Sequence, residues 1–197
     1  MLMLIEAMEA DKIKAAHISF GASVQIMLTK NDNIRNRARA LFTKTEKEMK
    51  RINKEYQQAL ELKGDPLKGQ VVYRENCAIC HQVRGKIGVA IGPDLGTIHN
   101  WTREDIMANI LDPNLSISSG FDMWEARTAN GELAQGIIVS ETPTAITFRN
   151  NGKLDRTLNR KDIVSLSALN LSAMPGGFEK TISHQQMADL LAFLRKP

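Results

Sequence analysis

The chain has 197 residues, of which 43% are hydrophobic and 24% are charged. This length supports one ordinary core with at most a small second domain, and the composition excludes disordered and collagen-like classes. The net charge of +4 comes mainly from residues 30–63, which hold ten Lys or Arg against five Asp or Glu. A basic surface can attract nucleic acid or anionic lipid, but no nucleic-acid motif accompanies these charges. We interpret them as a solvated helix face and expect no nucleic-acid partner.

The first sixty residues have the periodicity of helices. Two apolar stripes at helical spacing run over residues 34–42, behind a cap at Asn31 or Asp32, and over residues 45–60. Gly64-Asp65-Pro66 then breaks the pattern, so we expect a domain border just before it.

A second set of helices is predicted after this break. Residues 67–76 have a helical pattern that leads directly into the cysteines, and residues 84–98 form a Gly-rich loop. Thr102 with Asp105 resembles a capping box, and the apolar face that follows ends at Asp112-Pro113-Asn114.

From residue 121 the hydrophobic period changes to two. Asn130-Gly131 and Asn151-Gly152 each separate β-rich runs, which is typical of hairpins. We expect three or four antiparallel strands, at Phe121–Ala129, Glu132–Ser140, Ala145–Arg149 and Lys153–Leu158. After them, Ser183 with Gln186 predicts a capped, amphipathic final helix.

Cys77-Ala78-Ile79-Cys80-His81 is the pattern for covalent attachment of a c-type haem. One helical turn places both thiols where they can form thioethers with the two vinyl groups, and the adjacent imidazole then meets the iron from one face. These are the only two cysteines of the chain, and they are too close together for the usual structural disulfide. We expect Cys77 and Cys80 to attach one haem c, with His81 as the proximal iron ligand.

Two other chemistries compete for the same cysteines. A thioredoxin-type dithiol requires a preceding strand, whereas the lead-in over residues 67–76 has a helical pattern. A zinc site requires two further ligands, and His17, His99 and His184 are scattered without paired spacing. Both alternatives are less favoured than haem.

A second axial ligand is expected on the iron of an electron carrier, and methionine is the usual partner of histidine. Met174 stands in the tight loop Leu171–Gly177, which no helical stripe includes. Other methionines are explained as core residues: Met27, Met49, Met107 and Met187. Met174 is therefore a candidate ligand, with a core role as the alternative.

The chain resembles class I cytochromes c over residues 66–120 and 167–197. Gly69 and Tyr73 match the small and aromatic residues of that family's first helix. The resemblance implies that they pack against the last helix, at Ala188–Arg195.

The loop Gly92-Pro93-Asp94-Leu95 resembles the Gly-Pro-x-Leu loop of the same family. The resemblance implies that the Pro93 carbonyl accepts a hydrogen bond from His81 Nδ1 and orients the ring. The alternative role of Pro93 is a simple loop breaker.

A closer resemblance covers nearly the whole chain. Gly64–Gly69, the CxxCH motif, Leu111–Asn114, the β-rich insert and Ser172–Gly176 are similar to the putative haem-binding domain of large planctomycete and verrucomicrobial proteins. That domain ends chains with helical repeats and a dehydrogenase-like propeller. The resemblance implies that Met174 is the distal ligand and that residues 1–62 are the end of a helical array.

We therefore expect a mainly α chain with a class I cytochrome c fold, interrupted by a small antiparallel β insertion. Residues 1–63 form a repeat-like helical segment. Residues 64–120 plus 167–197 form the cytochrome c domain, and residues 121–166 form the insertion.

The expected function is one-electron transfer, which favours an electron carrier over an enzyme. The expected partner is a redox protein or a dehydrogenase domain. One alternative is an open-site haem protein, a gas sensor or peroxidase, for which Arg127 and His99 are weak distal candidates. The other alternative is an interaction module built on the β insert.

Export is expected from the haem chemistry, because covalent attachment to cysteines normally takes place outside the cytoplasm. The start, Met1–Glu6, lacks the basic region of a secretory signal, and no apolar run approaches the ~18 residues of a membrane span. We expect the sequence to be a mature or excised part of a longer protein that is periplasmic or otherwise exported.

Overall fold

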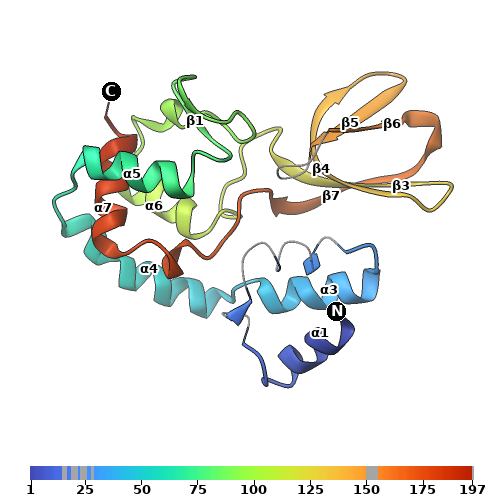
Figure 1. Cartoon of the computed structure of the whole chain (residues 1–197), viewed down its shortest axis with the longest axis horizontal. Coiled ribbons are helices and arrows are strands. Elements are labelled where there is room, and N and C mark those ends of the chain that lie inside the picture. The colour runs from blue at the N-terminus through green and yellow to red at the C-terminus, as the bar shows by residue number, and fades with distance from the viewer. Residues whose placement is uncertain (15–16, 19–21, 23–25, 28, 150–154, 197) are drawn as a thin grey trace. The chain divides into compact units, whose positions relative to one another are not determined.

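The computed structural model describes residues 1–14, 17–18, 22, 26–27, 29–149 and 155–196 (Figure 1). The chain divides into two compact units, Met1–Arg51 and Ile52–Pro197. The division falls inside a helix, whereas the sequence placed a border near residue 63. Each unit is described by itself.

The first unit contains helices α1, Leu2–Glu9, and α3, Asp32–Phe42. Its core includes Ile5, Ile26 and Ala38, all of which are buried. The cap of α3 is Asn31, whose Oδ1 accepts a hydrogen bond from the Ile34 N–H at 3.0 Å. The sequence allowed either Asn31 or Asp32 as the N-cap, and the structure shows that it is Asn31.

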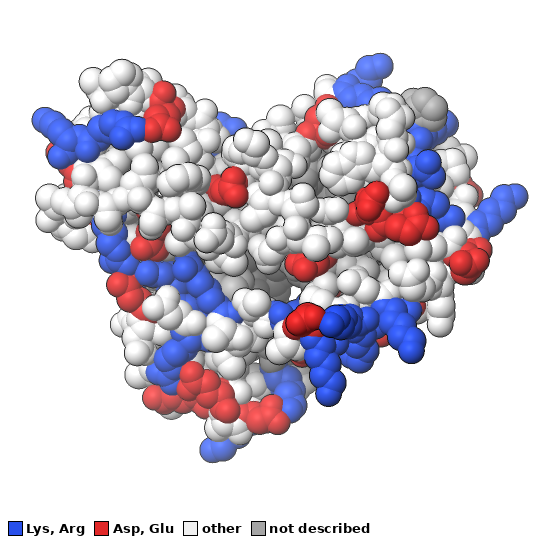
Figure 2. Space-filling model, turned by 180° about the vertical axis from the view of Figure 1, so that it is seen from behind, with Lys and Arg blue, Asp and Glu red and all other residues white. Residues whose placement is uncertain are grey.

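Charged side chains of both signs share the face shown in Figure 2, where Lys and Arg lie interspersed with Asp and Glu. In the first unit, Arg37 Nε donates to Glu9 Oε1 at 2.8 Å. In helix α4, Glu46–Glu61, Lys50 pairs with Glu46 across one turn. Such pairs are typical of a solvated helix face.

Helix α4, Glu46–Glu61, ends inside the second unit, where Ile52, Tyr56 and Ala59 are buried. Its last carbonyls accept hydrogen bonds from one half-buried guanidinium, that of Arg103. The donor–acceptor distances are 2.8 Å to Leu60 O, 2.9 Å to Ala59 O and 3.1 Å to Leu62 O. These bonds explain why the end of α4 belongs to the second unit, because they satisfy carbonyls that a helix C-terminus otherwise leaves free.

Arg103→Ala should lower the free energy of unfolding by about 2 kcal/mol, because hydrogen bonds from a charged donor to three carbonyls are lost. Urea unfolding followed by circular dichroism measures this loss. Arg74→Ala is the matched control, since Arg74 is an exposed helical arginine. An equal, small loss in both variants would contradict the capping role.

Helices α5, Pro66–Asn76, and α7, His184–Leu194, lie side by side (Figure 1). A Cβ at Gly69 would lie only 1.9 Å from the Asp189 carbonyl oxygen, so the backbones touch at this glycine. The rings of Tyr73 and Phe193 are 5.3 Å apart between centroids. The expected packing of Gly69 and Tyr73 against the last helix is confirmed.

The helix caps follow the sequence closely. Thr102 accepts from the Asp105 N–H at the start of α6, Arg103–Leu111. Ser183 and Gln186 form a complete capping box at the start of α7. Both caps are as predicted, because capping depends on residues only three positions apart.

Five strands follow α6: β3, Asp122–Thr128; β4, Leu133–Glu141; β5, Ala145–Arg149; β6, Arg156–Asn159; and β7, Ile163–Ser172. They form an antiparallel sheet in the order β6-β5-β4-β3-β7. One face buries a core that includes Ala126, Ile146 and Phe148. Gly131 turns the β3–β4 hairpin at φ 81°, as its Asn-Gly pair predicted.

The sheet corrects two expectations. It has five strands instead of three or four, and β7 continues to Ser172, past the expected end of the insertion at residue 166. A chain with this sheet combines helices with a substantial strand content, so it is not clearly mainly α as expected. The missed strand pairs with β3, a distant segment, and no local hairpin signal marks it. Asn151-Gly152 lies outside the described residues.

Short elements complete the second unit. They are β1, Gln82–Val83, β2, Ile87–Gly88, and the 3₁₀ helices η2, Leu95–Ile98, η3, Arg160–Asp162, and η4, Phe178–Lys180. Within the described residues, no helix combines the length and the apolar character required to cross a bilayer.

Candidate functional site

The two cysteines lie in a turn that continues α5. The Cys77 N–H donates to the Tyr73 carbonyl at 2.8 Å, and the His81 N–H donates to the Cys77 carbonyl at 2.9 Å. Both cysteines are free thiols and are partly exposed. Ile79, between them, is 74% exposed. The helix end therefore holds both sulfurs within one turn and leaves them accessible to a ligand.

His81 is buried, and its ring is oriented by a backbone carbonyl. Its Nδ1 lies 2.8 Å from the Pro93 oxygen. A carbonyl can only accept, so Nδ1 carries the proton and Nε2 keeps the free electron pair. The contact that the resemblance implied is present, and it leaves the nitrogen required for iron ligation available.

Gly92 packs directly against the imidazole, which the sequence did not predict. A Cβ at this position would lie 2.6 Å from His81 Cε1, so a larger residue would displace the ring. The Gly92 N–H also donates to the Cys80 carbonyl at 2.7 Å. The sequence offered one indication of this contact, the glycine directly before Pro93. The role of Gly92 becomes visible only when its loop packs against His81 in the folded chain.

The ionisation of the site differs from that of a reactive dithiol. Burial, followed by the nearby Cys80, raises the pKa of Cys77 to about 12, and burial also raises the pKa of Cys80. Reactive dithiols need a lowered pKa to supply thiolate. Burial lowers the pKa of His81, which the bond to Pro93 only partly opposes. The imidazole is therefore neutral at neutral pH, as a metal ligand must be.

The zinc alternative also lacks its donor set. In the part of the chain that the structure describes, no three His, Cys, Asp or Glu side chains gather in a metal-binding group. The element before Cys77 is helix α5 rather than the strand of a thioredoxin-like site.

Tyr73 and Asp94 support the site, and sequence reasoning did not identify these contacts. The buried Tyr73 hydroxyl donates to the His81 carbonyl, and it lies 2.9 Å from the Ile87 carbonyl. Burial is the main cause that raises the pKa of Tyr73 to about 12, so this donor keeps its proton. The Asp94 carboxylate accepts backbone N–H groups from two loops, at Arg84, Gly85 and Gly96.

Asp94 makes the stability of these loops dependent on pH. Burial acts to raise the pKa of Asp94, but three backbone N–H donors outweigh it and hold the pKa below its usual range. A lowered folded-state pKa contributes stability above the unfolded value, near 3.9 for Asp, and this stability is lost as pH falls through the folded value. Asp94→Asn should therefore lower the free energy of unfolding at neutral pH.

The difference between wild type and Asp94→Asn should shrink as pH falls from about 6 to about 3, because the wild-type carboxylate becomes protonated. Urea unfolding at each pH measures the difference. A constant difference over this range would contradict the assignment of the low pKa to Asp94.

Met174 lies in the loop between β7 and η4, apart in sequence from the cysteine turn, and it is half-buried. Its N–H donates to Ser172 Oγ at 3.1 Å. The Ser172 N–H donates in turn to Asn114 Oδ1 at 2.8 Å. The start of the loop is therefore fixed, and iron ligation by Met174 stays a prediction.

The distal candidates of the open-site alternative have other partners. Arg127, on β3, pairs with Glu125 at 3.2 Å. His99 Nδ1 lies 2.9 Å from the Gly96 carbonyl at the end of η2. Both side chains are therefore engaged by residues close to them in the sequence. These contacts do not support the alternative hypothesis of an open-site haem protein.

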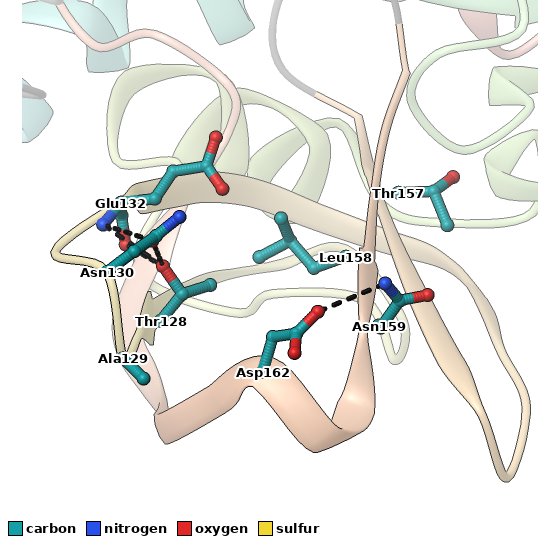
Figure 3. A pocket seen from close by; sticks show the side chains of 8 residues that line it. All are labelled: Thr128, Ala129, Asn130, Glu132, Thr157, Leu158, Asn159 and Asp162. Carbon is teal, nitrogen blue, oxygen red and sulfur yellow. Dashed lines mark hydrogen bonds between the residues drawn. The ribbon is translucent and has the colours of Figure 1, made fainter.

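A polar pocket of about 270 Å³ lies in the sheet (Figure 3). Its carboxylates have partners in the sheet, because Asn159 donates to Asp162 at 3.0 Å and Arg156 pairs with Glu132. It contains none of the residues of the cysteine–histidine site. The lining residues are Thr128, Ala129, Asn130, Glu132, Thr157, Leu158, Asn159 and Asp162.

The described residues fit a covalently bound haem. Two free thiols lie one turn apart, and the adjacent buried imidazole has its Nδ1 engaged and its Nε2 available. A search among curated proteins found no match. Residues 66–141 match the family model for cytochrome c, a stretch that includes the CxxCH turn and Gly92–Leu95 and ends before Met174. Residues 66–141 are therefore similar to cytochrome c, a family of haem-binding electron-transfer proteins.

Proposed function

We propose that this domain carries one haem c on Cys77 and Cys80, ligated by His81 and Met174, and transfers single electrons within a larger exported, dehydrogenase-like protein. The observation that carries the proposal is the CxxCH turn at the end of α5, with His81 Nδ1 on the Pro93 carbonyl at 2.8 Å. The match to the cytochrome c family over this turn supports it.

The residues of the chain have separate parts in this function. The thiols of Cys77 and Cys80 would anchor the group, and His81 Nε2 would ligate the metal, while the Pro93 carbonyl accepts the hydrogen bond from the other ring nitrogen. The group, when bound, supplies an iron that alternates between Fe(III) and Fe(II). Burial of His81 limits the access of water to the proximal side.

Met174 is proposed as the distal ligand because of the resemblance of Ser172–Gly176 to the haem-binding domain described above. The backbone beside Met174 is held in place, since the Ser172 N–H donates to Asn114 Oδ1 at 2.8 Å. A methionine thioether favours the reduced iron and so raises the reduction potential.

The proposed reaction is a one-electron exchange between proteins. A reduced dehydrogenase domain or protein loses one electron, the cytochrome domain gains it, and an oxidised acceptor protein later removes it. No bond is formed or broken on the chain during this exchange. Because haem attachment takes place outside the cytoplasm, we place the protein in the periplasm or another exported location.

The test uses the whole chain, produced in a host that attaches haem to CxxCH motifs. Mass spectrometry should show the mass of one haem, and a reductive titration should take up one electron per chain. The reduced spectrum should be low-spin, without binding of carbon monoxide. A chain without attached haem would refute the proposal, and a high-spin spectrum that shifts with carbon monoxide would favour the open-site alternative.

A further inference from the structure

The Asp94 side chain joins the loop that follows His81 to the loop that packs against the His81 ring. Asp94 Oδ1 accepts the Arg84 N–H at 2.7 Å, and Oδ2 accepts the Gly85 N–H at 2.6 Å, both in the loop after His81. Oδ1 also accepts the Gly96 N–H at 2.7 Å, in its own loop. One carboxylate thus connects the loop that follows the ligand to the loop that holds the ligand's hydrogen-bond acceptor.

The loop after His81 needs this connection. Arg84 has φ 56° and Gly85 has φ 64°, so two successive residues are in the left-handed region. This conformation is unfavourable for arginine, which has a Cβ, and the surrounding contacts must hold it. Their N–H groups both point to Asp94, which is the arrangement that binds an anionic oxygen.

Asp94 directly follows Pro93, whose carbonyl accepts the hydrogen bond from His81 Nδ1. The backbone position of Pro93 therefore depends on where the Asp94 carboxylate is held. Gly92, on the other side of Pro93, packs against the ring, so a shift of this loop changes both contacts of the imidazole.

We infer that Asp94 is a positioning residue for the proximal ligand: its carboxylate fixes the Pro93 carbonyl on His81 Nδ1 and thereby sets the basicity of the imidazole. This inference rests on the proposed function, in which His81 binds the iron. A strong Nδ1–H···O bond makes the imidazole a better donor, which stabilises Fe(III) relative to Fe(II). Loosening the loop should therefore raise the reduction potential.

Charge loss alone can also raise a potential, so the variants must separate charge from position. Asp94→Glu keeps the charge, but its longer side chain cannot accept all three N–H groups in this geometry. Asp94→Asn removes the charge and part of the accepting capacity. Asp65→Asn is the control for charge, because Asp65 also caps a helix in this unit through the N–H groups of Leu67 and Lys68.

Reduction potentials are measured on the purified chains with haem attached. Asp94→Glu and Asp94→Asn should both raise the ratio of reduced to oxidised protein at the wild-type midpoint by about tenfold, which is about 59 mV for one electron. Asp65→Asn should leave the midpoint within a small fraction of this shift. Nuclear magnetic resonance of the His81 Nδ1–H should show a weaker hydrogen bond in both Asp94 variants.

The outcomes are distinct. Asp94→Glu could keep the wild-type midpoint potential and an unchanged Nδ1–H signal, while only Asp94→Asn shifts the potential. Charge alone would then explain the shift in potential, and the inference would be overturned. If a variant does not retain haem, amide hydrogen exchange in the wild type still decides, since Arg84, Gly85 and Gly96 must be protected together. If the wild type itself carries no haem, the proposed function fails, and these variants play no part in that result.

Discussion

Replacing Gly69 with alanine is expected to remove much of the folding stability of the second unit, Ile52–Pro197. The new Cβ would lie 1.9 Å from the Asp189 carbonyl oxygen and 2.8 Å from the Phe193 Cβ. Both distances are shorter than van der Waals contact, so the alanine would clash sterically with α7. Helices α5 and α7 must therefore move apart. We expect a loss of about 3 kcal/mol or more in the free energy of unfolding, at the upper end of overpacking effects.

The loss should be large because several contacts depend on the same crossing. The Asp65 N–H donates to Asp189 Oδ1 at 2.8 Å, and the Tyr73 ring packs on Phe193. Asp189 is a buried carboxylate, so separation would also leave it with fewer donors. A typical domain has only about 5–15 kcal/mol of stability, so the folded fraction and the haem content should both fall.

Gly176→Ala is the matched control, because a Cβ at Gly176 meets nothing within 4 Å. Urea unfolding measures the stability of both variants, and their haem content is measured in parallel. The comparison is between a glycine in close contact with a neighbouring helix and a glycine with open space around it. Equal stabilities for the two variants would show that the α5–α7 crossing tolerates a side chain, contrary to the geometry.

Met174→Leu should abolish the near-infrared sulfur-to-iron band of the oxidised protein. Leucine preserves the apolar character and approximate volume of methionine but has no sulfur to bind a metal. The reduction potential should fall by a considerable part of the ~0.8 V range that axial ligands span, since the soft thioether favours Fe(II). Absorption spectra and a potentiometric titration measure both changes.

The control for this prediction is Met107→Leu. Met107 is buried in α6, only 2% exposed, and belongs to the helical core. The same substitution there should alter stability slightly and leave the band and the potential unchanged. Retention of the band in Met174→Leu would exclude Met174 as the ligand, while the attachment through Cys77 and Cys80 would be unaffected.

Local features of the fold were predictable because their causes are local. The caps at Asn31, Thr102 and Ser183 depend on side chains that reach a backbone N–H three residues away. The turn at Gly131 follows from the need for a positive φ in a short hairpin loop, a conformation that glycine adopts readily. Each of these was visible in a short stretch of sequence.

Strand β7 is a feature that local sequence patterns do not predict. It pairs with β3, so its existence depends on a partner some forty positions away. Its exposed and half-buried residues do not alternate strictly, because the strand has register shifts against β3. The expected insertion therefore ended at residue 166 instead of Ser172, and the strand content was underestimated.

The same division holds for the functional site. The sequence alone predicted haem attachment at Cys77 and Cys80 and iron ligation by His81, because two thiols and an imidazole within one turn are a local arrangement. The resemblance implied the bond from His81 Nδ1 to the Pro93 carbonyl, which the structure contains. The packing of Gly92 against the ring, and the link that the Asp94 carboxylate makes between the loop of Pro93 and the loop after His81, appeared only in the tertiary structure. The spacing of residues in the sequence shows which side chains can bind a haem together. The distances and hydrogen-bond directions around His81 depend instead on the paths of two loops, the one after His81 and the one that contains Gly92 and Asp94.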